Sequence, residues 1–351
     1  MKRFDMSRIL SMSILIIILI VAGCAEIHRP TLDAGAKFNR ETANVKEGRL
    51  DQTIPDYTKT KEITPRVTNQ YVKRGVAYFK KGQYDQAISD FTKAIKLNPE
   101  DAVAYINRGV SYIKKGQYDL AIYDLTKFIE LNPKYAHAYY NRGLSYAEKG
   151  QYDQAISDFT KFIEINPKCA MVYNNRGNAW HNKGDYNRAI DDYNKALKIN
   201  PRNAMVYNNR GNAWHNKGDY DRAIDDYNNA LEINPRYAKA YNDRGNAWSD
   251  KGDNDRAIAD YNKTLEINTR DSDAYNNRGV AWRKKGDYER AIDDYNKAIE
   301  INPRLTPAYI NRGNAWSDKG DYARACSDYQ KACELGNCKG LNWAKKKGYF
   351  K

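Results

Sequence analysis

One row of asparagines has the composition and spacing of a binding surface. Every 34 residues the same position recurs, and six of its eight occurrences are asparagine: Asn107, Asn141, Asn175, Asn209, Asn277 and Asn311. The other two are Lys73 and Asp243. An asparagine amide carries both a hydrogen-bond donor and an acceptor, as does each residue of a peptide backbone. Such a row could therefore hold an extended peptide without selecting its side chains. The competing interpretation is that these asparagines only cover a solvated helix face.

Two rows of opposite charge share the same interval. Arginine recurs at Arg74, Arg108, Arg142, Arg176, Arg210, Arg244, Arg278 and Arg312, and aspartate recurs at Asp90, Asp124, Asp158, Asp192, Asp226, Asp260, Asp294 and Asp328. Burying an arginine without a partner is costly, so a matched carboxylate in every interval is the expected compensation. We predict Arg–Asp pairs inside the fold. The alternative is a row of arginines that faces a ligand.

Catalytic constellations are missing from the sequence. It contains no G-x-S-x-G, no H-E-x-x-H and no G-x-x-x-x-G-K-[ST] motif. His181 and His215 lie 34 residues apart, on predicted neighbouring helices whose axes should be about 8–10 Å apart. We favour a binding surface over a metal site for these two side chains. The sequence therefore predicts a protein that is not an enzyme and holds no cofactor and no metal.

The cysteines fall into separate groups. Cys24 lies near the N-terminus, Cys169 stands apart, and Cys326, Cys333 and Cys338 form a cluster. Cys326 and Cys333 are seven residues apart on one predicted helix, a rise of about 10.5 Å, which is too far for a disulfide. Because Cys338 follows Gly336, where the chain can turn back, Cys333–Cys338 is the better pair. The alternative is that all three are buried free thiols.

All these rows belong to one 34-residue unit that is repeated eight times. The copies begin at Thr68, Ala102, Ala136, Ala170, Ala204, Ala238, Ser272 and Thr306. In the copy 204–237, two stretches with helical apolar spacing are separated by Gly218, and Pro235 closes the second. One short helix pair cannot cover its own apolar face, so neighbouring units must stack. The sequence predicts an all-α repeat domain over residues 68–339.

The unit resembles the tetratricopeptide repeat. The resemblance rests on the length of 34 residues and on Gly at position 8, Ala at position 20, aromatic residues at positions 4, 11 and 24, and Pro at position 32, which in one copy are Gly211, Ala223, Tyr207, Trp214, Tyr227 and Pro235. It implies a right-handed superhelical solenoid of eight helix-turn-helix repeats. Residues 340–351 are expected to form a C-terminal capping helix, because Lys347 occupies the small position 8.

The resemblance also implies where a ligand would bind. In this family the first helices line the concave face, which places the asparagine row in a groove together with Asn174, Asn178, Asn208, Asn212, Asn242, Asn246, His181 and His215. The row resembles the asparagine ladder with which the tetratricopeptide domain of O-GlcNAc transferase holds an extended peptide backbone. The expected partner is therefore a protein or peptide, bound as an extended segment across repeats three to six.

The N-terminus has the pattern of an export signal. Basic residues precede the uncharged run 9–23, whose length is short of the ~20 residues that span a bilayer. Residues 21–24, VAGC, resemble the lipobox of bacterial lipoproteins. The resemblance implies that residues 1–23 are removed and that Cys24 is acylated, while residues 24–67 form a tether. The alternative is a plain signal anchor with an incidental cysteine.

A lipid-anchored exported protein is expected in the bacterial cell envelope. Ala25 favours the periplasmic face of the outer membrane, because an Asp after the lipidated cysteine retains lipoproteins of enteric bacteria at the inner membrane. Bacterial lipoproteins of similar build assist pilus assembly or cell-wall hydrolases, so we expect a membrane-anchored scaffold and no nucleic-acid partner. The net charge of +14 supports a second hypothesis, in which the basic surface binds anionic wall or lipid polymers.

Overall fold

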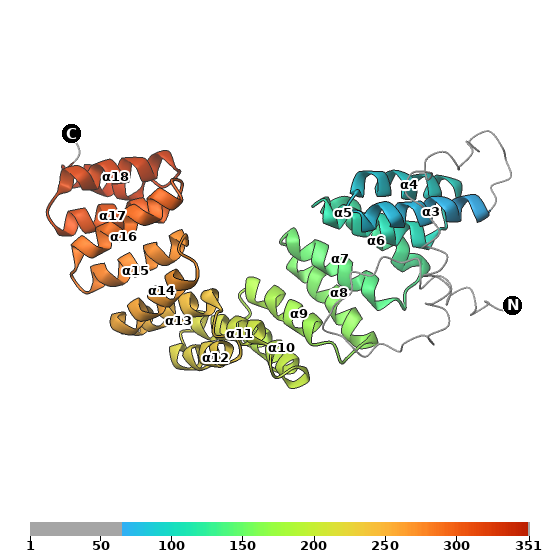
Figure 1. Ribbon diagram of the computed structural model, residues 1–351, viewed down its shortest axis with the longest axis horizontal. Helices are drawn as coiled ribbons and strands as arrows, with labels where there is room; N and C mark the ends of the chain where they lie inside the picture. Colours follow the sequence, from blue (N-terminus) through green and yellow to red (C-terminus); the bar gives the residue numbers. More distant parts are fainter. Residues whose placement is uncertain (1–64, 350–351) are drawn as a thin grey trace. The chain divides into compact units, whose positions relative to one another are not determined.

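The structure is a computed structural model that describes residues 65–349 (Figure 1). The predicted signal sequence, Cys24 and nearly all of the predicted tether lie outside these residues. The described part contains seventeen α-helices and no strand, so the predicted all-α class is confirmed. No helix in it is long and apolar enough to cross a membrane. The chain forms two compact units, Met1–Ile199 and Asn200–Lys351, which we describe separately.

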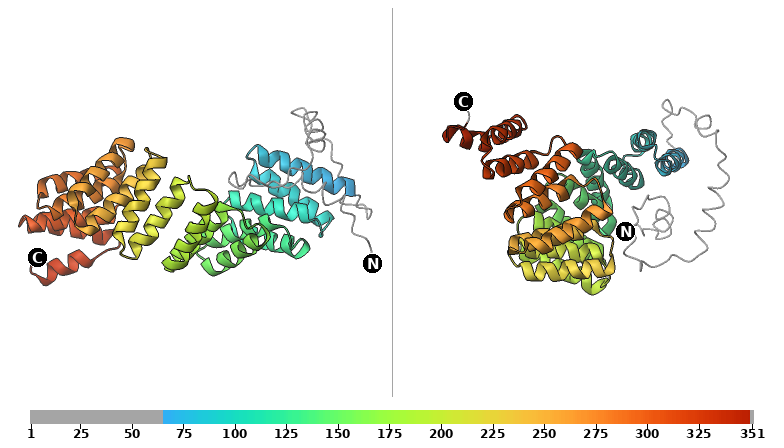
Figure 2. Two further views of the ribbon diagram at one scale, coloured as in Figure 1. Left: turned by 90° about the horizontal axis from the view of Figure 1, so that it is seen from below. Right: turned by 60° about the vertical axis from the view of Figure 1, so that its left-hand side comes forward.

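Each unit is built from antiparallel helix pairs, one pair for each repeat (Figures 1 and 2). In the first unit the pairs are α3 (Pro65–Lys80) with α4 (Tyr84–Leu97), α5 (Ala102–Lys114) with α6 (Tyr118–Leu131), α7 (Ala136–Glu148) with α8 (Tyr152–Ile165), and α9 (Ala170–Asn182) with α10 (Tyr186–Ile199). In the second they are α11 (Ala204–Asn216) with α12 (Tyr220–Ile233), α13 (Ala238–Lys251) with α14 (Asn254–Ile267), α15 (Ser272–Lys284) with α16 (Tyr288–Ile301), and α17 (Thr306–Asp318) with α18 (Tyr322–Glu334). Within a unit, each pair packs on the next.

Local sequence explains where the helices begin and end. Gly218 has a φ of +80° and turns the chain after α11, a conformation that glycine adopts without steric cost. The Asp219 carboxylate then accepts a hydrogen bond from the Arg222 backbone N–H and caps α12. The predicted break at Gly218 is confirmed.

A glycine sets how closely the two helices of a repeat approach. A Cβ placed on Gly211 would lie 2.7 Å from Cε1 of the Tyr227 ring. Because every repeat carries a small residue at positions 8 and 20, the sequence predicts that Gly211 faces Ala223. In the structure the nearest side chain is instead the ring at position 24, which is 1% exposed. Glycine is required because a buried aromatic ring, rather than a small side chain, fills the space opposite it.

The predicted Arg–Asp pairs are present in all eight repeats, and each joins the first helix to the second. Arg278 donates from Nε to Asp294 Oδ2 at 2.8 Å and from Nη2 to Oδ1 at 2.6 Å. The other seven pairs have the same two-bonded geometry. The arginines are therefore structural, and the alternative of a ligand-facing row is wrong.

Arginines of both units also reach the preceding repeat, which the sequence did not predict. Arg278 donates from Nη1 to Asn262 Oδ1 at 2.6 Å, and Arg142 likewise donates to Thr126 Oγ1 at 3.0 Å. The same bond is made by Arg108, Arg176, Arg244 and Arg312. One guanidinium thus ties together three helices from two successive repeats.

Burial limits what the Arg278–Asp294 pair adds to stability. Burial raises the pKa of Asp294, although the hydrogen bond and charge of Arg278 oppose it. The hydrogen bond that Arg278 donates to Asp294 raises the pKa of the guanidinium. The charged carboxylate is therefore less favoured in the folded protein than in water, as expected where desolvation outweighs the ion pair.

A contact between a tryptophan and an arginine distinguishes repeats four to eight from repeats one to three. The later repeats carry Trp180, Trp214, Trp248, Trp282 and Trp316 at position 11, and an arginine from position 19 lies 3.6–4.5 Å from each ring centroid. Arg222 stacks on Trp214 in this way and is held by Asp219 at 2.6 Å. In repeats one to three, where position 11 is Tyr, position 19 is Gln or Leu. The change from Tyr to Trp therefore accompanies a stacking arginine.

The C-terminal helix α19 (Lys339–Lys346) packs on α18 through Leu341 and Ala344. It begins one residue earlier than predicted and is shorter, because Gly348, with a φ of +74°, lies just beyond its end. Cys333 and Cys338 form a disulfide at the start of this segment, with Cα atoms 4.0 Å apart. Cys326 is a buried free thiol.

Breaking one Arg–Asp pair should be far more damaging than removing both partners. We expect Arg278→Ala to lower the free energy of unfolding by about 3 kcal/mol, because it leaves Asp294 buried without its partner. Arg278→Leu combined with Asp294→Leu should recover most of that loss. The measurement is chemical denaturation followed by circular dichroism.

Lys297→Ala, on the same helix as Asp294, is the control. Its side chain is 58% exposed and pairs with Glu300, so the loss should stay below about 1 kcal/mol. A double variant no more stable than Arg278→Ala would show that the pair itself is strongly stabilising.

Candidate functional site

The predicted asparagine row lies on the first helices, but its members are not equally accessible. Asn107 on α5 is 0% exposed and Asn141 on α7 is 3% exposed. Asn175 in the first unit, and Asn209, Asn277 and Asn311 in the second, are half-buried. Solvent therefore reaches the four later members, whereas Asn107 and Asn141 do not offer an accessible amide.

In the second unit these asparagines form a hydrogen-bonded chain between first helices. Asn311 donates from Nδ2 to Asn276 Oδ1 at 3.0 Å, and Asn276 donates to Asn277 Oδ1 at 3.3 Å. Asn277 in turn donates to Asn242 Oδ1 at 3.2 Å. Adjacent asparagines at positions 5 and 6 thus connect three successive repeats.

The same link appears with other residues elsewhere. Asn208 donates to Asp243 Oδ2 at 2.9 Å, which reverses the direction because a carboxylate only accepts. In the first unit, Asn175 donates to the hydroxyl of Tyr140 at 3.1 Å. The side chains of the row therefore bond to one another and to neighbouring residues of the protein. Only the donors and acceptors that these bonds leave unused are open to a ligand.

Three other predicted groove residues hold core tyrosines. Asn178, Asn212 and Asn246 accept hydrogen bonds from the hydroxyls of Tyr193, Tyr227 and Tyr261 at 2.7, 2.6 and 2.8 Å. Their amide oxygens are thus committed within their own repeats. The expectation that they widen the groove needs this correction, because a buried tyrosine hydroxyl requires a partner.

Two positions of the repeat vary together and signal this pairing in the sequence. Position 9 is Asn where position 24 is Tyr, as in Asn314 with Tyr329, and aliphatic where position 24 is Phe or Leu. Repeat seven breaks the rule, because it combines Val280 with Tyr295. The Tyr295 hydroxyl is buried and has no hydrogen-bond partner.

The two predicted histidines lie beside loop tyrosines. His181 lies 5.3 Å from Tyr186, and His215 lies 5.4 Å from Tyr220, between ring centroids. His215 Nε2 is also 3.0 Å from Asp250 Oδ2 of the next repeat. The residues that the structure describes contain no group of three His, Cys, Asp or Glu side chains able to hold a metal.

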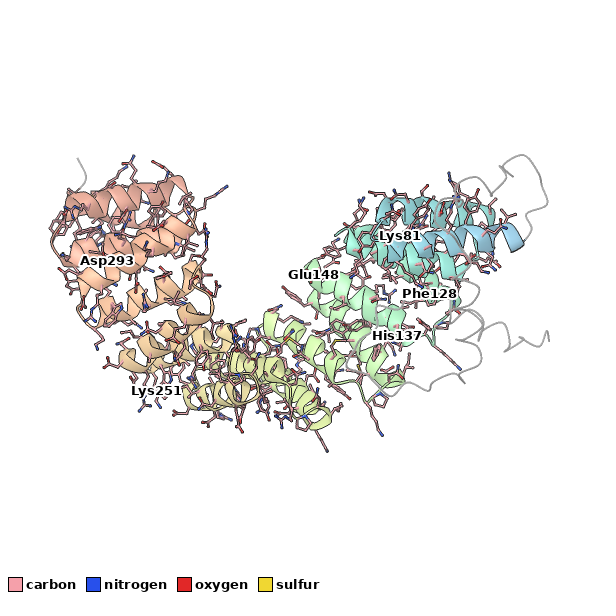
Figure 3. The ribbon with its side chains drawn as sticks, viewed as in Figure 1. Lys81, Phe128, His137, Glu148, Lys251 and Asp293 are labelled. Atoms are coloured by element: carbon pink, nitrogen blue, oxygen red, sulfur yellow. A yellow bond between two sulfur atoms is a disulfide. The ribbon has the colours of Figure 1, made fainter. Side chains whose placement is uncertain are left out.

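An aromatic cluster in the first unit contains a third histidine. His137, labelled in Figure 3 with Phe128, lies 5.6 Å from Tyr135 and 5.7 Å from Phe162 between ring centroids. Phe128 packs against the same Tyr135 at 5.3 Å. Burial lowers the pKa of His137. The bulky Phe128 and Phe162, unusual at position 27, are thus accommodated by this cluster.

A cavity occurs at the turn of repeat six. It has a volume of about 590 Å³ and is lined by Trp248, Asn254, Arg256 and the Lys251 labelled in Figure 3, among others. The equivalent cavity in repeat five, beside Tyr220, has a volume of about 330 Å³. Asn254 stands where the other repeats carry a loop tyrosine, so the missing ring explains the larger space. The cations and acids around it are paired, as in Lys285 with Asp255.

Removing a tyrosine hydroxyl should matter in repeat five and not in repeat seven. Tyr227→Phe leaves Asn212 Oδ1 without its donor and should cost about 1–2 kcal/mol of unfolding free energy. Tyr295→Phe removes an unpartnered buried hydroxyl and should leave stability equal or higher. Val280→Asn should stabilise the wild type but not the Tyr295→Phe protein. Equal losses in the two Tyr→Phe variants, measured by chemical denaturation, would contradict the assignment.

Comparison with known proteins agrees with this geometry. The family model described as tetratricopeptide repeat matches residues 136–169, 170–203, 204–237 and 272–305. A second model of that description matches 238–271 and 306–335, and a model described as TPR repeat matches 75–116 and 110–150. Comparison with curated proteins finds no match.

Several solved structures are similar to this chain. A tetratricopeptide repeat protein from Parabacteroides merdae has 22% identity and a TM-score of 0.60, over 71% of this chain and 99% of that one. PilF of Pseudomonas aeruginosa has 20% identity and a TM-score of 0.52, over 60% and 97%. MamA has 30% identity and a TM-score of 0.45, over 47% and 96%. The matched residues and the repeated helix pairs together show that this chain belongs to the tetratricopeptide repeat family.

Proposed function

We propose that the protein is a non-enzymatic scaffold that binds an extended segment of a partner protein on the first helices of its repeats. Tetratricopeptide repeat proteins mediate protein–protein interactions. The observation that carries the proposal is the half-buried asparagine row of the second unit, which includes Asn209, Asn277 and Asn311. These amides are accessible, and neighbouring asparagines hold those of Asn277 and Asn311 in place.

The remaining capacity of these amides suits a peptide backbone. Asn277 donates one N–H to Asn242 and accepts one hydrogen bond from Asn276. Its second N–H and second oxygen lone pair stay available, which is the pair of functions that a backbone amide needs. Because the neighbours fix the orientation of the amide, little side-chain entropy is lost when a ligand binds. Such a surface accepts many sequences in an extended conformation.

The partner is expected in the cell envelope, through an anchor at Cys24. This part of the proposal rests on the sequence VAGC at 21–24, which lies outside the described residues. A scaffold held at a membrane by acyl chains would present its repeats to assembling envelope components, such as pilus or cell-wall machinery.

Removing two row asparagines should weaken partner binding without unfolding the protein. A partner is first captured by crosslinking in membranes and identified. We then expect Asn277→Ala with Asn311→Ala to weaken its affinity at least tenfold, about 1.4 kcal/mol over two hydrogen-bonding sites. Asn229→Ala, an exposed asparagine on the second helix α12, is the matched control. Unchanged affinity in the double variant, with its circular dichroism intact, would move the binding surface elsewhere.

Substitution of Cys24 tests the anchor separately. The Cys24→Ala protein should accumulate as an unprocessed precursor or appear as a released soluble form, because no thiol remains to be acylated. Wild type and variant are compared by partitioning into a detergent phase and by mass spectrometry of the N-terminus. Identical partitioning of both proteins would rule out acylation of this residue.

A further inference from the structure

The second unit ends in a segment whose charge differs from that of the repeats. In the repeats, lysines pair with acids of the same or the neighbouring repeat, as in Lys319 with Glu289 at 2.6 Å and Lys297 with Glu300 at 2.8 Å. Residues 335–351 contain five lysines and no acidic residue. The excess of positive charge is therefore concentrated at the C-terminal end of the unit.

The lysines of α19 face away from the repeats. Leu341 and Ala344 are buried against α18, and a Cβ on Gly340 would lie 2.4 Å from the Tyr329 ring, so this side of α19 is closely packed. Lys339, Lys345, Lys346 and Lys347 are all exposed. The helix thus uses its apolar side to cover the last repeat and presents its lysines to the surroundings.

Three exposed aromatic residues lie beside these lysines. Tyr322 stacks on Tyr349 with ring centroids 3.9 Å apart and planes 5° apart, and Trp343 lies 5.7 Å from Tyr349. The three side chains are 38%, 42% and 39% exposed for Tyr322, Trp343 and Tyr349. In repeat eight, position 12 is Ser317, so this position offers no ring to the loop tyrosine Tyr322. The ring that Tyr322 contacts is instead that of Tyr349, from the segment after α19.

We propose that this C-terminal surface, formed by Tyr322, Trp343, Tyr349 and Lys339, Lys345, Lys346 and Lys347, binds an anionic membrane surface. Lysines close to an anionic leaflet are attracted by its negative surface potential, and tryptophan and tyrosine favour the interface between headgroups and acyl chains. Because the apolar side of α19 is already packed on α18, the segment lies on the membrane and does not insert as a helix. A soluble polyanion would engage the lysines but would give no reason for the three exposed rings.

The inference is tested on the full chain incorporated into vesicles, read out at the C-terminal segment itself. Vesicles of phosphatidylcholine are compared with vesicles of phosphatidylcholine and phosphatidylglycerol, and deuterium uptake of peptides covering residues 335–349 is measured by mass spectrometry. Uptake should be slower only on the anionic vesicles, and the protection should disappear at high salt, which screens exposed charges. The readout is local, so attachment of the chain through its N-terminus does not affect it.

Matched variants separate this surface from the general basic character of the chain. Lys345→Gln, Lys346→Gln and Lys347→Gln together should abolish the protection. Lys263→Gln, Lys297→Gln and Lys331→Gln, which remove the same charge from second helices of repeats six to eight, should retain it. Equal uptake on both kinds of vesicle, or equal loss of protection in both triple variants, would overturn the proposal. So would the same protection by soluble polyphosphate without vesicles.

Discussion

The structure depends on one charged contact that recurs in every repeat. A guanidinium at position 7 binds both oxygens of an aspartate at position 23, as in Arg312 with Asp328 at 2.9 and 2.6 Å. In Arg312 the third nitrogen also reaches position 25 of the preceding repeat, Asn296, at 2.6 Å. Because the fork of the arginine is planar and rigid, these three bonds define the spacing of three helices at once. In the Arg278–Asp294 pair, burial of the carboxylate works against the ion pair, so the contribution there is geometry more than net stability.

Around this contact the polar side chains hold the repeats together, and in the proposed function some of them also recognise a partner. The asparagines at positions 5 and 6 connect first helices, and those at position 9 satisfy buried tyrosines, as Asn212 does for Tyr227. A residue that serves the fold is already held in one orientation, so whatever accessible capacity it keeps is preorganised for a ligand. In a repeat protein a binding surface can therefore arise from structural residues that have hydrogen-bonding capacity left over.

Residues at certain pairs of positions vary together and divide the eight repeats into two types. Repeats four to eight join a tryptophan to a stacking arginine, as in Trp282 with Arg290 at 3.7 Å. Repeats one to three have tyrosine and no such arginine. Repeat seven keeps the tyrosine of position 24 but lacks its asparagine partner, and the Tyr295 hydroxyl is left without a hydrogen bond. Each type is explained by pairs of positions and not by single residues.

The sequence alone determined the repeat length, the helix pairs, the turn at Gly218 and the pairing of arginine with aspartate, because each follows from local propensity or from the cost of burying a charge. It also suggested Cys333 with Cys338 as the pair to form a disulfide. Only the tertiary structure decided which asparagines are accessible, that Asn107 is buried while Asn277 is half-buried, and that Asn178 holds a core tyrosine. Position within a repeat specifies the face of a helix, whereas accessibility depends on what packs against that face. Identical residues in equivalent positions can therefore differ in what they do.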